Sequence, residues 1–175
     1  MTLSAPLTEP PFQIVALTDQ DRSTFSCGAV PLDDYLRRQA NQDVKRHVAA
    51  CFVAIHASTG RLAGYYTLSA CHLYLNDLPP EWQRKLPKYP TVPAVRLGRL
   101  AIDLGFQGRN LGAALLANAA KRALRSEVAA ALMVVDAKDN HAAKFYRHHG
   151  FVPDPTAPSR LYAPLETLRV GLELR

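Results

Sequence analysis

Cysteine is scarce in this sequence, and long apolar runs are absent. The three cysteines, Cys27, Cys51 and Cys71, are odd in number and widely spaced, with no Cys-x-x-Cys pair. This spacing indicates free thiols in a reducing compartment and argues against a disulfide framework or a cysteine zinc site. No stretch approaches the roughly 18 apolar residues that a transmembrane helix needs. The first twelve residues have neither a basic start nor an apolar run, so we expect no secretory signal and a cytoplasmic protein.

Several nucleotide- and metal-binding signatures are also missing. The six histidines form no His-Glu-x-x-His pair, so we expect no metal cofactor. No Gly-x-Gly-x-x-Gly is present, and the one glycine-containing loop that precedes a helix lacks the Lys-Ser/Thr of a P-loop. The sequence therefore argues against a dinucleotide-binding enzyme and a P-loop NTPase.

The composition is that of an ordinary globular protein with a basic balance. The chain has 175 residues, 48% of them hydrophobic and 21% charged, which predicts one domain over residues 1–175 with a loose N-terminal arm of about residues 1–11. The formal net charge is +6 and the isoelectric point is near 9.4. A basic protein favours polyanionic partners, such as a nucleic acid or a cofactor phosphate.

The patterning along the chain predicts a mixed α/β sandwich. The first part of the chain predicts an extended segment at 12–17, a turn at 25–28, a helix over 31–44 and a β-hairpin of 50–56 and 61–70. A proline-rich loop with at most a short helix around Trp82 follows over 78–93, and then come a strand at 94–103, a glycine loop at 106–112 and a helix to about 126. The last part predicts a strand at 128–136, a helix at 139–149, and a strand, a loop and a strand from 151, with the final extended stretch over 161–174.

The loop between the strand at 94–103 and the following helix is the most informative segment. Such a loop aims unpaired backbone N–H groups outward, and the helix dipole adds partial positive charge, so the turn can hold a pyrophosphate. Gly108 and Gly112 have no side chain to block that approach. A plain glycine-bearing turn is the alternative.

The segment Gln107-Gly-Arg-Asn-Leu-Gly112 resembles the Gln/Arg-x-x-Gly-x-Gly/Ala motif of GNAT acetyltransferases, which hold the pyrophosphate of CoA. Asn110 stands where that family usually has its first glycine. Asparagine adopts left-handed conformations more readily than other non-glycine residues, so we expect the turn to survive, with a side chain that adds bulk near the phosphate. The resemblance implies a GNAT fold: a mostly antiparallel mixed sheet that splays at a central parallel strand pair and is flanked by helices. It assigns the acetyl-CoA contacts to Leu100, Ala101, Ile102, Phe106, Gln107, Gly108, Arg109, Asn110, Leu111 and Gly112.

A second segment, from Asp136 to Phe151, resembles the end of the GNAT fold, where a splayed strand leads into a helix with an early Asn and a late Phe-Tyr. By that analogy Asn140 contacts the cofactor arm and Tyr146 donates a proton to the leaving CoA thiolate. A hydroxyl donor is chemically suited to this step because it stabilises the thiolate charge as it develops. The alternative is that Tyr146 is one more aromatic core residue on an amphipathic helix.

A narrower resemblance covers most of the chain, roughly residues 25–168. It lies in Phe-x-Cys-Gly at 25–28, Leu-Asp-x-Tyr-Leu at 32–36, Ala-x-Gln-Asp at 40–43, Gly-Tyr-Tyr-Thr-Leu-Ser at 64–69 and Leu-Gly-Arg-Leu-Ala-Ile-Asp at 97–103. Together these segments look like the GNAT toxins of toxin–antitoxin pairs, which acetylate the α-amino group of aminoacyl-tRNA and so block translation. The resemblance implies a ribbon-helix-helix antitoxin as partner and a homodimer.

For tRNA phosphates the candidate contacts are Arg37, Arg38, Lys45, Arg46, Arg96 and Arg99. Arg38, Asn41, Gln42 and Lys45 recur at helical spacing and share one polar side. For the first four candidates the alternative is an ordinary solvated basic helix face, whereas Arg96 and Arg99 fall in a strand expected to be buried. The α-amine of an aminoacyl ester has a lower pKa than a lysine, so a site without a strong general base could serve. The sequence singles out none of Asp103, His141 and His148 as that base.

Two other functions fit the sequence. One is a GNAT acetyltransferase of a small amine, an antibiotic or a protein N-terminus, with the same fold and cofactor but another acceptor. The other is a basic binding module that keeps the fold without catalysis. Tyr146 and Gln107 argue against this second alternative, and Asn110 is the feature that favours it.

Overall fold

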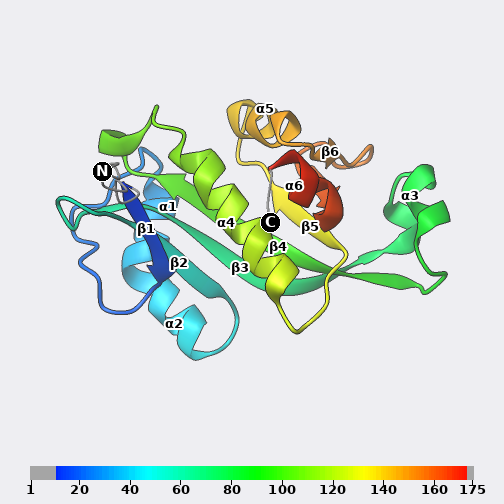
Figure 1. Cartoon of the computed structure of the whole chain (residues 1–175), viewed down its shortest axis with the longest axis horizontal. Helices are drawn as coiled ribbons and strands as arrows, with labels where there is room; N and C mark the ends of the chain where they lie inside the picture. Colours follow the sequence, from blue (N-terminus) through cyan, green and yellow to red (C-terminus); the bar gives the residue numbers. More distant parts are fainter. Residues whose placement is uncertain (1–10, 173–175) are drawn as a thin grey trace, which may run out of the picture.

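The computed structural model describes residues 11–172, which are built around one seven-stranded sheet (Figure 1). The strands lie in the order β1-β2-β3-β4-β5-β7-β6. Neighbouring strands are antiparallel throughout, except that β4 and β5 are parallel. The bounds are β1 Phe12–Ala16, β2 Ala50–His56, β3 Leu62–Tyr74, β4 Thr91–Ile102, β5 Leu132–Asp136, β6 Val152–Pro153 and β7 Arg160–Pro164. The expected mixed sheet with a central parallel pair is confirmed.

Helices cover both faces of the sheet (Figure 1). One face carries α4 (Leu111–Arg125), α5 (Asn140–His148) and α6 (Leu165–Gly171), and the other carries α1 (Val30–Asp34), the π-helical turn η1 (Tyr35–Gln39) and α2 (Ala40–Lys45). Successive side chains of β3 point into opposite layers, because side chains alternate between the two faces of a sheet along a strand. Tyr66 packs with Leu115 and Leu116 of α4, whereas Tyr65 packs with Leu36 under the first helices.

The hairpin of β3 and β4 extends beyond the rest of the sheet and carries α3 (Pro80–Lys85) at its tip (Figure 1). The turns η2 (Leu75–Asp77) and η3 (Leu104–Phe106) follow β3 and β4. Trp82 packs against the Tyr162 ring, which ties the tip to β7. The short helix expected around Trp82 is confirmed, and β4 begins three residues earlier than the sequence predicted.

Two sequence predictions about extended structure are wrong. The stretch expected to be extended over 161–174 turns into α6 after Pro164, because Leu165 and Leu168 lie three residues apart and both bury against the α4 layer; residues 173–174 lie outside the described part of the chain. The strand expected from residue 128 begins only at Leu132. Val128 is 77% exposed, so this end of the apolar run has no sheet to cover it.

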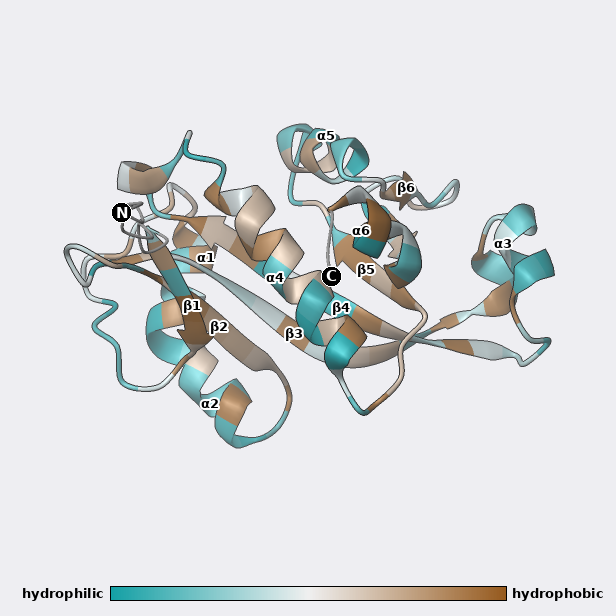
Figure 2. Cartoon of the chain, viewed as in Figure 1, coloured by the Kyte–Doolittle hydropathy of each residue, from teal (hydrophilic) through white to brown (hydrophobic). Residues whose placement is uncertain are grey.

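The hydropathy pattern follows these layers. Figure 2 shows hydrophobic residues along β2 and β5, and hydrophilic residues along much of α3 and α5. Within residues 11–172, no helix is long and apolar enough to cross a membrane.

Candidate functional site

A cleft opens where the two parallel strands separate. β4 pairs with β5 from Ala94 to Leu97, and beyond that point β4 pairs with β3 alone. The β3–β4 register skips Gly98, which is a β-bulge at the point of separation. Because a bulge bends its strand, it directs the end of β4 away from β5. The main-chain groups of β4 on this side are therefore left without a strand partner and border the cleft.

The cleft has a volume of about 790 Å³ and is lined by the end of β4, the start of α4 and residues of α5. It collects most of the residues that the sequence singled out for the cofactor and the acid: Leu100, Ala101, Ile102, Phe106, Gln107, Gly108, Asn110, Leu111, Gly112 and Tyr146. Arg109 and Asn140 are not among its lining residues. Arg109 is exposed with its guanidinium 5.3 Å from the Phe106 ring centroid, and Asn140 is exposed at the start of α5.

The turn before α4 presents main-chain donors to this cleft. Gly108 has φ +77° and Asn110 has φ +58°, so the turn uses two left-handed residues to reverse direction into the helix. Asn110 is the N-cap of α4, and its side chain does not cap the helix. The first N–H groups of a 15-residue helix are thus free of a side-chain cap, and the helix dipole points at the cleft. This is a site suited to a phosphate or pyrophosphate.

Asn110 replaces the first glycine of the motif and has the left-handed backbone conformation that this position requires. Asparagine adopts the conformation that the motif's glycine would supply, as the sequence predicted. A side chain at Gly108 would meet no atom within 4 Å, so the turn is open on its outer side.

Tyr146 differs from the other buried tyrosines in its hydroxyl. Five tyrosines are buried in the described residues. Four of their hydroxyls donate to fixed oxygens, those of Tyr35, Tyr65, Tyr66 and Tyr162 to Asp43, Leu32, Asn118 and Asp77 respectively. The Tyr146 hydroxyl has no hydrogen-bond partner within residues 11–172, although the residue is only 7% exposed. Buried tyrosine hydroxyls usually find a partner, so this one is left available to a molecule in the cleft.

The environment keeps that hydroxyl protonated. The ring packs against Phe145 and Phe151 in the core under α5. Burial raises the pKa of Tyr146 well above its ordinary value. A raised pKa means that the phenol keeps its proton across the physiological range. It can therefore donate a hydrogen bond to a thiolate as the negative charge develops on the sulfur.

Sequence reasoning missed several residues of the cleft. They are Cys27, Ala113, Lys138, Asp139, Ala142, Phe145 and His149. Helical spacing from Tyr146 could have found Ala142, four residues before it, and His149, three residues after it. Phe145 is its direct neighbour in the sequence and does not follow from that spacing. Cys27 lies far away in the sequence, and nothing local predicted it.

Three histidines lie along the cleft. His141 and His148 line it with His149, whose pKa is lowered by burial and by the nearby His148. Asp103 does not line it; this buried carboxylate accepts hydrogen bonds from the main-chain N–H groups of Ser26 and Gly105. Among residues 11–172, no group of His, Cys, Asp or Glu side chains is placed to hold a metal ion.

The basic residues proposed for tRNA do not form one cluster. Arg37, Arg38, Lys45 and Arg46 are exposed on the helical stretch from α1 to just past α2. Arg99 lies beneath the same stretch, with its guanidinium 3.5 Å from the Tyr35 ring centroid. Arg96 is separate from them and forms an ion pair with Asp136 at 2.5 Å across the parallel strands. No contact with RNA follows from these positions alone, so the tRNA role of all six remains a prediction.

A family profile and a characterised relative both identify the chain as similar to acetyltransferases. The profile of the acetyltransferase (GNAT) domain matches residues 47–153. A tRNA-acetylating toxin of Mycobacterium tuberculosis (strain ATCC 25618 / H37Rv) is 34% identical over 151 residues, which are 85% of this chain and 89% of that protein.

Solved structures of toxins have the same fold. The toxin AtaT complexed with acetyl-methionyl-tRNAfMet superposes with a TM-score of 0.81 at 29% identity, covering 91% of this chain and 98% of AtaT. A tyrosine-to-phenylalanine variant of AtaT bound to the C-terminus of the antitoxin AtaR and acetyl-CoA superposes with a TM-score of 0.75 at 25% identity, covering 92% and 98% of the two chains. With the splayed parallel strands, the pyrophosphate-type turn and this similarity over nearly its whole length, the chain belongs to the GNAT acetyltransferases and, among them, to the toxins of toxin–antitoxin systems.

Proposed function

We propose that the protein transfers the acetyl group of acetyl-CoA to the α-amino group of an aminoacyl-tRNA. The observation that carries the catalytic part is the unbonded, protonated hydroxyl of Tyr146 in a cleft whose other end is the uncapped start of α4. The acceptor is supported by the M. tuberculosis relative, which acetylates tRNA by its name, and by AtaT, solved with an acetylated methionyl-tRNA.

The residues of the chain have distinct tasks in this reaction. The N–H groups from Gly108 to Ala113 hold the pyrophosphate, and the unpaired edge of β4 from Leu100 to Ile102 lies along the arm that carries the thioester. The acceptor nitrogen attacks the thioester carbon and forms the new C–N bond. As the C–S bond breaks, Tyr146 gives its proton to the sulfur, and the proton released by the amine restores the phenol through solvent. Asn140 and Arg109, which do not line the cleft, would contact more distant parts of acetyl-CoA.

The acceptor would approach along the exposed helical stretch that contains Arg37, Arg38, Lys45 and Arg46. Arg99, stacked on Tyr35, adds positive charge beneath that stretch. Arg96 would contribute only in addition to its ion pair with Asp136. Lysine and arginine side chains bind phosphates regardless of the nucleotide sequence and release counterions. The affinity for tRNA should therefore fall steeply as the salt concentration rises.

The partners and setting follow from the same proposal. The chain would act in the cytoplasm, where aminoacyl-tRNA is found, as one GNAT domain over residues 1–175 and as a homodimer. An antitoxin of the ribbon-helix-helix type would inhibit it. AtaT supports the antitoxin part, because it has been solved bound to the C-terminus of AtaR.

A first experiment separates the enzyme from a non-catalytic binding module. Acetyl-CoA at 100 times its Kd should add about 2.7 kcal/mol to the free energy of unfolding, which corresponds to about 5–10 °C in Tm for a chain of this size. Calorimetric titration with acetyl-CoA at concentrations up to about millimolar gives the Kd directly. No binding and no thermal shift would refute both the pyrophosphate site proposed at the turn before α4 and the proposed enzymatic activity.

A second experiment tests the acceptor surface. Replacing Arg38 and Lys45 together by alanine should slow acetylation of charged tRNA and reduce the slope of log affinity against log salt by about two, one for each lost phosphate contact. The same variant should acetylate a small test amine like the wild type. An unchanged salt slope would remove this surface from the proposal. It would also favour the small-amine acetyltransferase if the small amine is the better substrate.

A further inference from the structure

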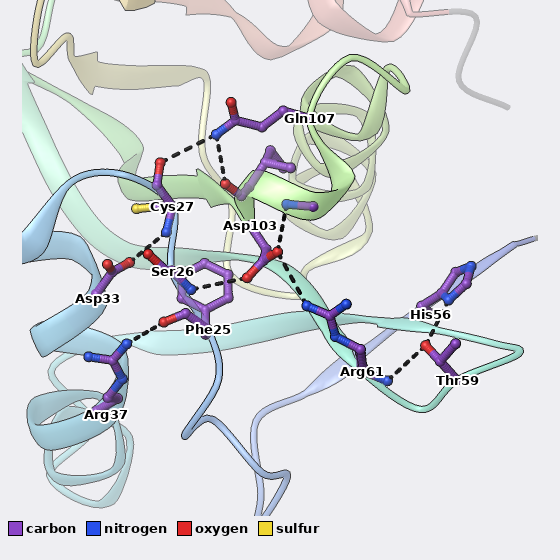
Figure 3. Close-up of polar contacts among 12 residues, drawn as sticks. Phe25, Ser26, Cys27, Asp33, Arg37, His56, Thr59, Arg61, Asp103 and Gln107 are labelled. Carbon is purple, nitrogen blue, oxygen red and sulfur yellow. Dashed lines mark hydrogen bonds and ion pairs between the residues drawn. The ribbon is translucent and has the colours of Figure 1, made fainter.

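A short segment of irregular backbone borders the cleft through one residue, and most of its main-chain polar groups form hydrogen bonds with other parts of the chain. This segment, Phe25–Gly28, is called the strap below. Cys27 of the strap lines the cleft together with the end of β4 and the start of α5. Since the strap has no strand or helix pairing of its own, its position depends on the residues that bind it (Figure 3).

The first anchors of the strap come from the helical stretch beneath it. The Asp33 carboxylate accepts from the Cys27 N–H at 2.9 Å, and the Arg37 guanidinium donates to the Phe25 carbonyl. Asp33 belongs to α1, and Arg37 lies in the basic stretch proposed to meet tRNA. The strap is therefore fixed to the acceptor side of the molecule.

The other anchors come from residues 103–107, which follow β4. Asp103 accepts from the Ser26 N–H at 3.0 Å and from the Gly105 N–H at 2.8 Å, and the Leu104 N–H donates to the Ser26 carbonyl at 2.8 Å. Gln107 completes this set, because its side-chain nitrogen donates to the Cys27 carbonyl at 3.3 Å and to the Ile102 carbonyl at 3.1 Å (Figure 3).

The side chain of Gln107 is thereby committed to the protein. An amide NH₂ has two hydrogens, and two main-chain carbonyls take them. Both neighbours are acceptors, so the nitrogen and not the oxygen must face them. The donors that remain for a pyrophosphate are the main-chain N–H groups of the turn and of the first turn of α4, and these do not depend on the Gln107 side chain.

We propose that Gln107 is a positioning residue, whose side chain fixes the strap against the end of β4 and so shapes the acceptor side of the cleft, rather than a ligand of acetyl-CoA. The inference rests on the proposed function for the identity of the acceptor, but not for the contact itself. It predicts that the two substrates respond differently when the amide is removed: binding of acetyl-CoA is kept and use of the acceptor is impaired.

The test compares Gln107→Leu with a matched glutamine elsewhere. Gln83 in α3 also donates through its amide to two main-chain carbonyls, those of Leu78 and Asn76, but it lies on the β3–β4 tip away from the cleft. Gln83→Leu therefore removes the same kind of contact without touching the strap. Gln107→Arg retains N–H donors at the position and is the variant expected to rescue the contact.

For Gln107→Leu we expect the Kd of acetyl-CoA, from calorimetry, to stay within about twofold of the wild type. The KM for aminoacyl-tRNA should rise about fivefold to tenfold, the range for losing one or two net hydrogen bonds. Gln83→Leu and Gln107→Arg should keep the wild-type KM. A weaker Kd for acetyl-CoA with an unchanged acceptor KM would make Gln107 a cofactor ligand and overturn the inference.

A readout independent of activity separates this inference from the proposed function. Cys27 is 8% exposed, and burial and Asp33 raise the pKa of its thiol, so maleimide should alkylate it slowly. In Gln107→Leu its alkylation, followed by peptide mass spectrometry, should accelerate about fivefold or more relative to the more exposed Cys71. If wild-type protein acetylates no aminoacyl-tRNA, the proposed acceptor fails while this measurement still stands. An unaltered Cys27 rate would mean that Gln107 does not hold the strap.

Discussion

Replacing Tyr146 by phenylalanine removes one oxygen from the cleft and leaves the ring in place. The hydroxyl has no partner within residues 11–172, so its removal breaks no hydrogen bond of the fold. The ring contacts with Phe145 and Phe151 remain. We therefore expect the free energy of unfolding to change by no more than about 0.5 kcal/mol, as for a substitution that disturbs no packing.

The effect on catalysis should be large by comparison. Loss of a positioned proton donor slows a reaction by about 10²-fold or more, which is about 2.7 kcal/mol in the activation barrier. The Kd of acetyl-CoA should change little, because we propose that the turn before α4, and not Tyr146, holds the pyrophosphate. The prediction is thus a loss in kcat without a matching loss in stability or cofactor affinity.

Tyr66→Phe provides the matched control. Its hydroxyl donates to Asn118 at 2.6 Å on the sheet face under α4 and does not line the cleft. Removing it should lower the free energy of unfolding by about 0.5–1.5 kcal/mol and leave turnover near the wild-type value. Urea unfolding and single-turnover transfer of labelled acetyl measure the two quantities. If Tyr146→Phe turns over like the wild type, or loses as much stability as Tyr66→Phe, Tyr146 is a core residue and the proton comes from elsewhere.

Three further predictions concern the turn, the second helix of the site and the response to pH. Asn110→Val should weaken acetyl-CoA binding and lower the free energy of unfolding by about 1–2 kcal/mol, because a branched side chain opposes φ +58°, whereas Asn110→Gly should do neither; calorimetry and urea unfolding check this. Asp139→Ala should lower the Tm of the protein and the free energy of unfolding by about 1 kcal/mol, because the Asp139 side chain caps α5 through the Ala142 N–H at 2.8 Å; an unchanged Tm would contradict it. Burial raises the pKa of Cys51 to about 12 and also raises the pKa of Tyr65, so these groups lose their protons at lower pH in the unfolded chain than in the folded one. The free energy of unfolding should therefore fall as pH rises above about 9. Urea titrations at a series of pH values up to about 11 measure this, and a constant free energy of unfolding would refute it.

The sequence predicted the parts of the site that are local in the chain. The glycine turn with its left-handed Asn110, the helix after it and the helix bearing Tyr146 each follow from residues within about a dozen positions of one another. Short-range chemistry decides them: φ preferences, the helix dipole and the helical repeat.

The parts that the sequence did not predict depend on contacts between distant segments. The hydrogen bond from Ser26 to Asp103 spans 77 residues and that from Gln107 to Cys27 spans 80. No periodicity in the sequence indicates that the strap lies against residues 103–107. The helical fate of 165–171 was missed for a related reason, since Leu165 and Leu168 are equally compatible with an extended segment until α4 is there to cover them. The free hydroxyl of Tyr146 could be recognised only when the partners of the other tyrosines were known.

Transfer of labelled acetyl from acetyl-CoA to charged tRNA, uncharged tRNA and free amino acid, run in parallel, tests the central claim most directly. The account predicts label on charged tRNA alone, released with the amino acid when the ester is hydrolysed, and lost in Tyr146→Phe. Equal labelling of the free amino acid, or labelling of uncharged tRNA, would contradict it.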